Sequence, residues 1–299
     1  MLTTVHILLT YTCPLRCKHC FVFGDPRAKG TFTPAQVTNT LAAIRTVESV
    51  EWVYFQGGEP FYHYPLLLTS VKKAVQSGFT VGVITNAYFA RTEEAAARFL
   101  KPLRDLGVAN LCISQDPYHY PSPGDTSARR ALRAAANLGL PTRRISVGPS
   151  RSAECADPEW IGKDFHSDFK LQWRGRAVEK LISGEPVQDW RRWDHCPSAN
   201  LDSLWRVDID PYGNVQICQG INLGNLDTSA LDRIITNDQI ASHPIVSFLR
   251  SGGPAALAKA YDPNPHGSYI DACHLCYTTR LALLDRFPSH LAPHQLYGL

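Results

Sequence analysis

Short apolar runs alternate with longer amphipathic segments along the first two-thirds of the chain. The apolar runs have the length of buried strands, and they cover 5–9, 51–55, 80–84, 110–114, 144–147 and 169–173. Helical patterning covers 34–48, 64–77, 91–105, 126–138, 157–165 and 175–183. Strands that alternate with helices predict βαβ units and a parallel sheet. Six such repeats fit a closed or partly open barrel, and the periodicity does not separate that barrel from a doubly wound sheet.

Two helix starts are marked by a capping side chain before proline, at Thr33-Pro34 and at Asp157-Pro158. Proline suits the first position of a helix, because the N–H group that it lacks has no partner there. We therefore expect helices to begin at these two points.

The alternation ends near residue 184, where glycine, proline and tryptophan residues interrupt it. Segments 207–210 and 214–217 then have strand character, and Pro211-Tyr212-Gly213 between them is a hairpin signal. We therefore expect an α/β domain over 1–184 and a smaller α+β domain with a β-hairpin over 185–299. Within the second domain we expect a helical stretch over 228–250 and a loop over 252–266.

Composition is that of a globular protein with a substantial core. The chain has 299 residues, of which 44% are hydrophobic and 19% charged. A formal net charge of +3 is too small to indicate nucleic acid or an anionic membrane surface as a partner. The apolar N-terminal run has no preceding basic residue and no small-residue cleavage site, and no apolar stretch reaches the roughly 20 residues of a membrane span. These features predict a cytoplasmic protein.

Nine cysteines are numerous for such a chain. In a reducing compartment they are expected to be metal ligands or catalytic groups rather than disulfides. Seven fall into two groups, which are Cys13, Cys17 and Cys20, and then Cys196, Cys218, Cys273 and Cys276. Cys112, in a predicted strand, and Cys155, in a loop-like stretch, stand alone and are expected to be inert.

The first group has the spacing C-x3-C-x2-C directly after the first predicted strand. Three thiolates on one loop can converge on one iron–sulfur cluster. Since a cubane cluster has four irons, three cysteines leave one iron open to a substrate or cofactor. A structural zinc site would need a fourth ligand, which His19 could supply.

This spacing resembles the radical S-adenosylmethionine (SAM) superfamily, and Gln56-Gly57-Gly58-Glu59-Pro60 after the second predicted strand extends the resemblance. The resemblance implies a partial (β/α)6 barrel and a [4Fe–4S] cluster on Cys13, Cys17 and Cys20. It also implies that the Gly-Gly-Glu segment contacts the SAM amino group. Paired glycines allow close approach of the backbone, and Glu59 offers a carboxylate to an ammonium group.

Further SAM contacts are implied at the ends of later strands and next to the third cysteine. The family places its adenine-contacting residue at the position of His19, and polar groups for the ribose or carboxylate at strand ends. The candidates are Asn86, Ser114, Asp116 and Arg176, with Arg174 an equal candidate to Arg176 for the SAM carboxylate. Catalytic residues of such barrels gather at the carboxyl ends of the strands.

The second cysteine group reads C-x16-G-x4-C from Cys196 through Gly213 to Cys218, followed by C-x2-C at Cys273 and Cys276. Four thiolates suffice for a [4Fe–4S] cluster or for zinc, and the spacing does not decide between them. The opening resembles the SPASM and twitch extensions of radical SAM enzymes. Because 277–299 holds no further cysteine, the resemblance is to the twitch type, which implies one auxiliary [4Fe–4S] cluster.

The resemblance implies reductive cleavage of SAM to a 5′-deoxyadenosyl radical, which abstracts hydrogen from a substrate. The implied partners are a reductant such as flavodoxin or ferredoxin and an unidentified peptide or small-molecule substrate. An iron–sulfur or zinc protein without catalysis, acting as an electron carrier or scaffold, is the alternative.

Overall fold

The computed structural model describes residues 1–122, 124–150, 168–262 and 264–299. Its main feature is an eight-stranded sheet in the order β5-β4-β3-β2-β1-β7-β8-β9. The strands of this sheet are β1 (Thr4–Thr10), β2 (Trp52–Gly57), β3 (Thr80–Thr85), β4 (Asn110–Ser114), β5 (Thr142–Ile145), β7 (Arg206–Ile209), β8 (Asn214–Cys218) and β9 (Ile221–Asn225). The strands from β5 to β1, and β7 beside β1, run parallel to one another. β8 is antiparallel to β7, and β9 is antiparallel to β8. The expectation of an α/β fold with a partial barrel is confirmed, since the sheet is mostly parallel and its described strands do not close a ring.

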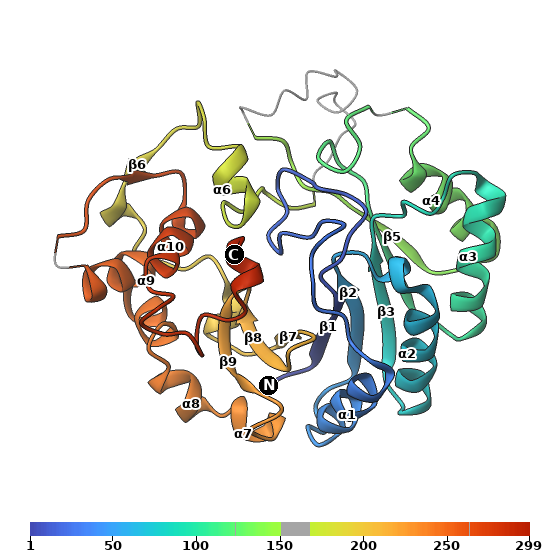
Figure 1. The fold of residues 1–299 in the computed structure, drawn as a ribbon, viewed down its shortest axis with the longest axis horizontal. Helices are drawn as coiled ribbons and strands as arrows, with labels where there is room; N and C mark the ends of the chain where they lie inside the picture. Colours follow the sequence, from blue (N-terminus) through green and yellow to red (C-terminus); the bar gives the residue numbers. More distant parts are fainter. Residues whose placement is uncertain (123, 151–167, 263) are drawn as a thin grey trace.

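Helices flank this sheet on both sides of its centre (Figure 1). Figure 1 shows α1 to α4 along the outer side of the parallel strands, and α9 and α10 on the side of β8 and β9. The helices are α1 (Pro34–Arg45), α2 (Tyr64–Gln76), α3 (Glu93–Asp105), α4 (Ser127–Leu138), α6 (Arg176–Lys180), α7 (Leu231–Ile234), α8 (Asn237–Ser242), α9 (Val246–Tyr261) and α10 (Ala272–Leu281). Short 3-10 turns are η1 (Pro60–His63), η2 (Trp190–Arg192), η3 (Ala199–Leu201) and η4 (His294–Tyr297), and β6 (Gln188–Asp189) pairs with β10 (Ser268–Tyr269). Among the described helices, none has the length and apolarity of a membrane span.

The centre of the sheet follows from the sequence pattern of β1. All seven of its residues are buried, as expected for a parallel strand covered on both faces. The predicted start of α1 is confirmed, because Thr33 caps the helix with Gln36 in a reciprocal capping box and Pro34 occupies its first turn. The second predicted helix start and the predicted helix 157–165 lie outside the described residues.

Two expectations for single segments are wrong. Segment 169–173 forms no strand, although Phe169 makes an isolated parallel bridge with Val147 beyond the end of β5. Segment 252–261 is helical rather than a loop, because α9 continues through a kink at Gly252 and Gly253 before Pro254 starts its second half. Composition alone missed this, since glycine and proline can mark a kink between two helical segments as well as a loop.

The hairpin of β7 and β8 is confirmed, and its placement was not predicted. β7 pairs in parallel with β1, with Thr4 opposite Arg206, so the sheet runs without interruption from the first 184 residues into the remainder. β9 extends the hairpin by a further strand. The C-terminal segment also reaches back, because Gln295 Nε2 donates to the carbonyls of Val22 and Phe23 at 3.2 Å each.

Candidate active site

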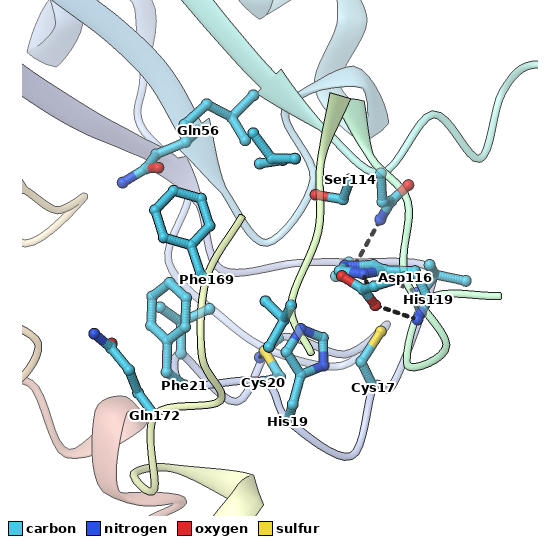
Figure 2. Close-up of a pocket in the computed structure, with 18 of the residues that line it drawn as sticks. Cys17, His19, Cys20, Phe21, Gln56, Ser114, Asp116, His119, Phe169 and Gln172 are labelled. Atoms are coloured by element: carbon cyan, nitrogen blue, oxygen red, sulfur yellow. Dashed lines mark hydrogen bonds and ion pairs between the residues drawn. The ribbon is translucent and has the colours of Figure 1, made fainter. Parts of the chain in front are cut away.

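A cavity of about 340 Å³ lies at the carboxyl ends of the parallel strands. Its lining includes side chains from the loops after β1 to β5 and from the chain after 168 (Figure 2). Of the residues expected at the SAM site, it is lined by Cys13, Cys17, His19, Cys20, Gly57, Gly58, Asn86, Ser114 and Asp116. The fold brings these residues together because the carboxyl ends of parallel strands meet at one edge of the sheet.

The cysteine loop is built to present sulfur to a cation. Leu15 N donates to Cys13 Sγ at 3.4 Å, Gly24 N to Cys20 Sγ at 3.3 Å, and Asn86 Nδ2 to Cys13 Sγ at 3.4 Å. Burial raises the pKa of the Cys13 thiol to about 12, and it raises the pKa of Cys17 and Cys20 as well. Thiolates in such a site need a metal to hold their charge, so the donor set fits an iron–sulfur cluster.

Gly57 and Gly58 are required by the backbone of the cysteine loop. Gly58 N donates to Thr10 O at 2.6 Å, and Glu59 N donates to Thr12 O at 2.9 Å. A Cβ at Gly57 would lie 2.2 Å from Thr10 O, and one at Gly58 would lie 2.3 Å from Thr12 O. The two glycines therefore let the end of β2 lock onto the start of the cysteine loop while lining the cavity themselves.

Glu59 is placed differently from the expectation that it offers its carboxylate to SAM. It is fully buried, and its carboxylate accepts from Phe61 N at 3.0 Å, Thr85 Oγ1 at 2.8 Å and Asn86 N at 2.7 Å. Burial raises its pKa to about 7, against the effect of these hydrogen bonds. Glu59 and Pro60 are not among the residues that line the cavity. In the described structure the Glu59 carboxylate ties the ends of β2 and β3 together.

Arg176 is also placed away from the cavity, contrary to its expected contact with the SAM carboxylate. Its Nη1 donates to Cys17 O at 2.9 Å, its Nη2 to Gly24 O at 3.2 Å, and its backbone N to Cys20 O at 3.0 Å. Gly175, at φ +61°, makes room for this contact, because a Cβ there would lie 2.6 Å from Phe21 Cα. Arg176 therefore holds the cysteine loop in place through its backbone carbonyls. Arg174, the other arginine of this pair, lines the cavity.

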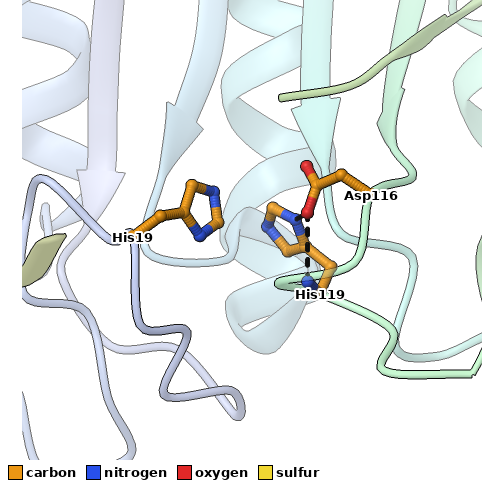
Figure 3. A group of neighbouring side chains, drawn as sticks. All are labelled: His19, Asp116 and His119. Atoms are coloured by element: carbon orange, nitrogen blue, oxygen red, sulfur yellow. Dashed lines mark hydrogen bonds and ion pairs between the residues drawn. The ribbon is translucent and has the colours of Figure 1, made fainter. Parts of the chain in front are cut away.

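His19, Asp116 and His119 form a compact group at one end of the cavity. One ligand atom from each lies within 4.8 Å of the others, and Figure 3 shows the His119 ring between His19 and the Asp116 carboxylate. Asp116 Oδ1 accepts from His119 Nδ1 at 2.9 Å. Burial lowers the pKa of His19 to about 4. Burial also acts against the charges of Asp116 and His119, but their mutual attraction outweighs it, holding the pKa of Asp116 at about 2 and raising that of His119.

Asp116→Asn is expected to lower the free energy of unfolding at pH 7 by about 2 kcal/mol, because the pKa of Asp116 is depressed by roughly two units. A depressed pKa stabilises the fold above the unfolded value near 4, and this contribution is lost as pH falls through 2. Urea denaturation of both proteins should therefore show a difference that persists from pH 7 to about 4 and shrinks below it. Asp105→Asn, which breaks an exposed ion pair with Arg104, should change little. A difference that stays constant at low pH would exclude the ion pair as its source.

The rest of the cavity wall had little signal in the sequence. Figure 2 shows the Phe21 and Phe169 rings across from the Asp116–His119 pair, with Gln56 and Gln172 beyond them. Arg206 and Gln219 also line the cavity, and they come from the C-terminal strands and the turn after β8. Only the non-local pairing of β7 with β1 brings them there, so no local pattern could have identified them.

The four later cysteines line a second cavity, of about 240 Å³. They come from three separate parts of the chain, which are the loop after η2 for Cys196, the end of β8 for Cys218, and the first turns of α10 for Cys273 and Cys276. Burial raises the pKa of Cys196 to about 12 and raises those of Cys273 and Cys276. Cys112 lies in β4 and lines neither cavity, and Cys155 lies outside the described residues.

Three arginines line the second cavity, and one of them, Arg206, faces Asp208 Oδ1 at 3.5 Å. The other two are Arg174 and Arg280. Arg174 Nη1 donates to Cys218 Sγ at 2.9 Å. Arg280 is 2% exposed, and its Nη1 donates to Gln219 O and to Tyr297 Oη, each at 2.8 Å. Among the described residues, neither guanidinium has a carboxylate within 4.0 Å. A buried cation without a counterion is costly, and an anionic cluster held by four thiolates would be such a counterion.

Comparison with known protein families supports an iron–sulfur and SAM site at the N-terminal cysteine loop. Residues 7–156, half of the chain, match the Radical SAM superfamily, and the chain belongs to that superfamily. It is therefore a radical SAM enzyme, for which the family implies a [4Fe–4S] cluster and SAM, and the non-catalytic alternative is wrong. No curated protein matches the chain.

Solved structures show the same fold at low sequence identity. BtrN in complex with AdoMet and 2-DOIA is 15% identical with a TM-score of 0.56, over 84% of this chain and 88% of that one. Native anSMEcpe with bound AdoMet is 13% identical with a TM-score of 0.53, over 96% of this chain and 97% of that one. At these identities the likeness concerns the fold alone.

Proposed function

We propose that this radical SAM enzyme binds two [4Fe–4S] clusters and acts on a substrate held between them. The SAM-cleaving cluster is assigned to Cys13, Cys17 and Cys20, and the auxiliary cluster to Cys196, Cys218, Cys273 and Cys276. The observation that carries this proposal is the shared wall of the two cavities. Gln172, Arg174, Arg206 and Gln219 line both of them.

The residues predicted at the SAM site divide into those that line the first cavity and those that lie outside it and hold the loops in place. We assign SAM contacts to Gly57, Gly58, Asn86, Ser114, Asp116 and His19. Glu59 and Arg176 act outside the cavity, Glu59 by accepting from Thr85 Oγ1 and Asn86 N, and Arg176 by donating to Cys17 O and Gly24 O. Pro60 follows Glu59 at the start of η1. When bound, the cluster and SAM would supply radical hydrogen-abstraction chemistry. The surrounding protein orients the ligands and excludes water.

Substrate and reductant are proposed by class only. Aromatic rings from Phe21 and Phe169 and amides from Gln56 and Gln172 line the part of the cavity away from His119. Such a surface suits a peptide segment or a polar small molecule. A flavodoxin or ferredoxin is proposed as electron donor, and 185–299 is proposed as a twitch-type auxiliary domain appended to the barrel domain 1–184.

The proposal predicts that the two clusters can be separated by mutation. Anaerobically reconstituted wild type should hold about eight irons per chain, four for each cluster. The double variant Cys273→Ser, Cys276→Ser should hold about four, and with dithionite and SAM it should still form 5′-deoxyadenosine. Iron, sulfide and zinc analysis and chromatography of the nucleoside product measure these outcomes.

Cys112→Ser is the matched control, because this cysteine is buried in β4 and lines neither cavity. It should keep about eight irons. Four irons in the wild type, or zinc at the C-terminal cysteines, would contradict the auxiliary cluster. Wild type that binds iron but cleaves no SAM would contradict the assignment of the first site.

A further inference from the structure

Arg174 lies in the wall between the two cavities and touches groups on both sides. Its Nη1 donates to Cys218 Sγ at 2.9 Å. Its guanidinium carbon lies 5.2 Å from the centre of the Phe21 ring, which directly follows Cys20 in the chain. Its Nε is buried and has no hydrogen-bond partner among the described residues. A single cationic side chain therefore spans the distance from the cysteine loop to an auxiliary cysteine.

The charge of Arg174 is directed at the auxiliary cysteines. No carboxylate lies within 4.0 Å of its guanidinium among the described residues, although its charge also acts on the more distant Asp271 carboxylate. Arg280 also interacts with an auxiliary cysteine, Cys276, while its Nη1 donates to Gln219 O and Tyr297 Oη. Unlike Arg174, it lines only the second cavity. Arg206 lines the same wall, but its Nε faces Asp208 Oδ1 at 3.5 Å.

A hydrogen bond from a cation to a ligand sulfur favours the more negative, reduced state of an iron–sulfur cluster. We infer that Arg174 is a positioning residue for the auxiliary cluster, and that its bond to Cys218 raises the reduction potential of that cluster. This inference rests on the auxiliary cluster of the proposed function. It assigns the control of that potential to a residue that also lines the SAM cavity.

The test is a redox titration of the reconstituted full-length protein, followed by electron paramagnetic resonance. The auxiliary signal is identified as the one that remains in Cys17→Ala. At the midpoint potential of the wild type, the ratio of reduced to oxidised auxiliary cluster in Arg174→Gln should be about tenfold lower, which for a one-electron couple corresponds to a shift of about 59 mV to lower potential. Arg174→Lys keeps the charge but loses the planar fork of donors, so it should shift in the same direction by less.

Arg206→Gln is the matched control, because it removes a positive charge from the same wall without removing a bond to a cysteine sulfur. Its auxiliary potential should stay close to that of the wild type. A shift as large as that of Arg174→Gln would overturn the role of the Arg174–Cys218 bond in favour of a general effect of charge. If Arg174→Gln fails to retain its auxiliary iron, Arg174→Lys carries the test, and an unchanged potential there overturns the inference.

Iron content separates this inference from the proposed function. About eight irons in Arg174→Gln with an unshifted auxiliary potential would overturn the role of Arg174 and leave both clusters in place. About four irons in the wild type would overturn the auxiliary cluster itself, and the inference with it.

Discussion

Cys17→Ala is expected to abolish formation of 5′-deoxyadenosine from SAM. The three cysteines of the N-terminal loop leave no spare ligand, and loss of a direct ligand should exceed the effects of about 10 to 100-fold that follow from losing an outer partner of a metal ligand. We therefore expect a loss of more than about 100-fold under dithionite. Nucleoside chromatography of the anaerobic reaction measures it.

The same variant should keep the auxiliary cluster, and with it about half of the iron of the wild type. Cys112→Ala, which removes a buried cysteine outside both cavities, should retain full iron and SAM cleavage. Undiminished SAM cleavage by Cys17→Ala would show that the cluster is held elsewhere. Loss of folding in both variants would show only that these side chains matter for packing.

Gly58→Ala is expected to destabilise the protein by about 3 kcal/mol, at the upper end for overpacking of a close contact. The added Cβ would lie 2.3 Å from Thr12 O and 2.4 Å from Tyr11 O. Both oxygens belong to the backbone of the cysteine loop, so the strain cannot be relieved by turning a side chain. The loop must move away from β2, and with it the sulfur of Cys13. Urea denaturation and iron content per chain measure the two effects.

Gly124→Ala provides the control, since a Cβ at that glycine has no atom within 4 Å and needs no unusual backbone conformation. It should leave stability and iron content close to those of the wild type. Equal stability of Gly58→Ala and Gly124→Ala would contradict the close approach of β2 to the cysteine loop. If Gly58→Ala kept the stability of the wild type but lost iron, Gly58 would be needed for cluster binding and not for stability.

Local sequence signals predicted the parts of the site that are close together in the chain. Cys13, Cys17 and Cys20 share one short loop, so their spacing predicted that they lie at one site, and all three line the first cavity. The first five strands and their helices were likewise predicted, because apolar runs and amphipathic segments reflect burial of each element by itself. The prediction of a sixth strand over 169–173 was wrong. It assumed that an apolar run is buried, but Phe169 is 52% exposed.

Side-chain direction within the site was not predictable from the sequence. Glu59 and Arg176 stand at positions that resemble the family motifs, and both were expected to face SAM. Their side chains turn instead toward backbone groups, Glu59 toward Asn86 N and Arg176 toward Cys17 O. The chain sequence gives the position of a residue in a loop, but the direction of its side chain depends on partners that the fold brings in.

By itself the sequence determined the grouping of the cysteines, the alternation of strands and helices, and the presence of paired glycines after the second strand. Only the tertiary structure decided that four cysteines from three distant segments line one cavity, and that Arg174 rather than Arg176 faces both sites. The physical reason is that these contacts depend on the pairing of β7 with β1, a long-range choice that no local pattern encodes. The same pairing places the two cysteine groups on opposite sides of one wall.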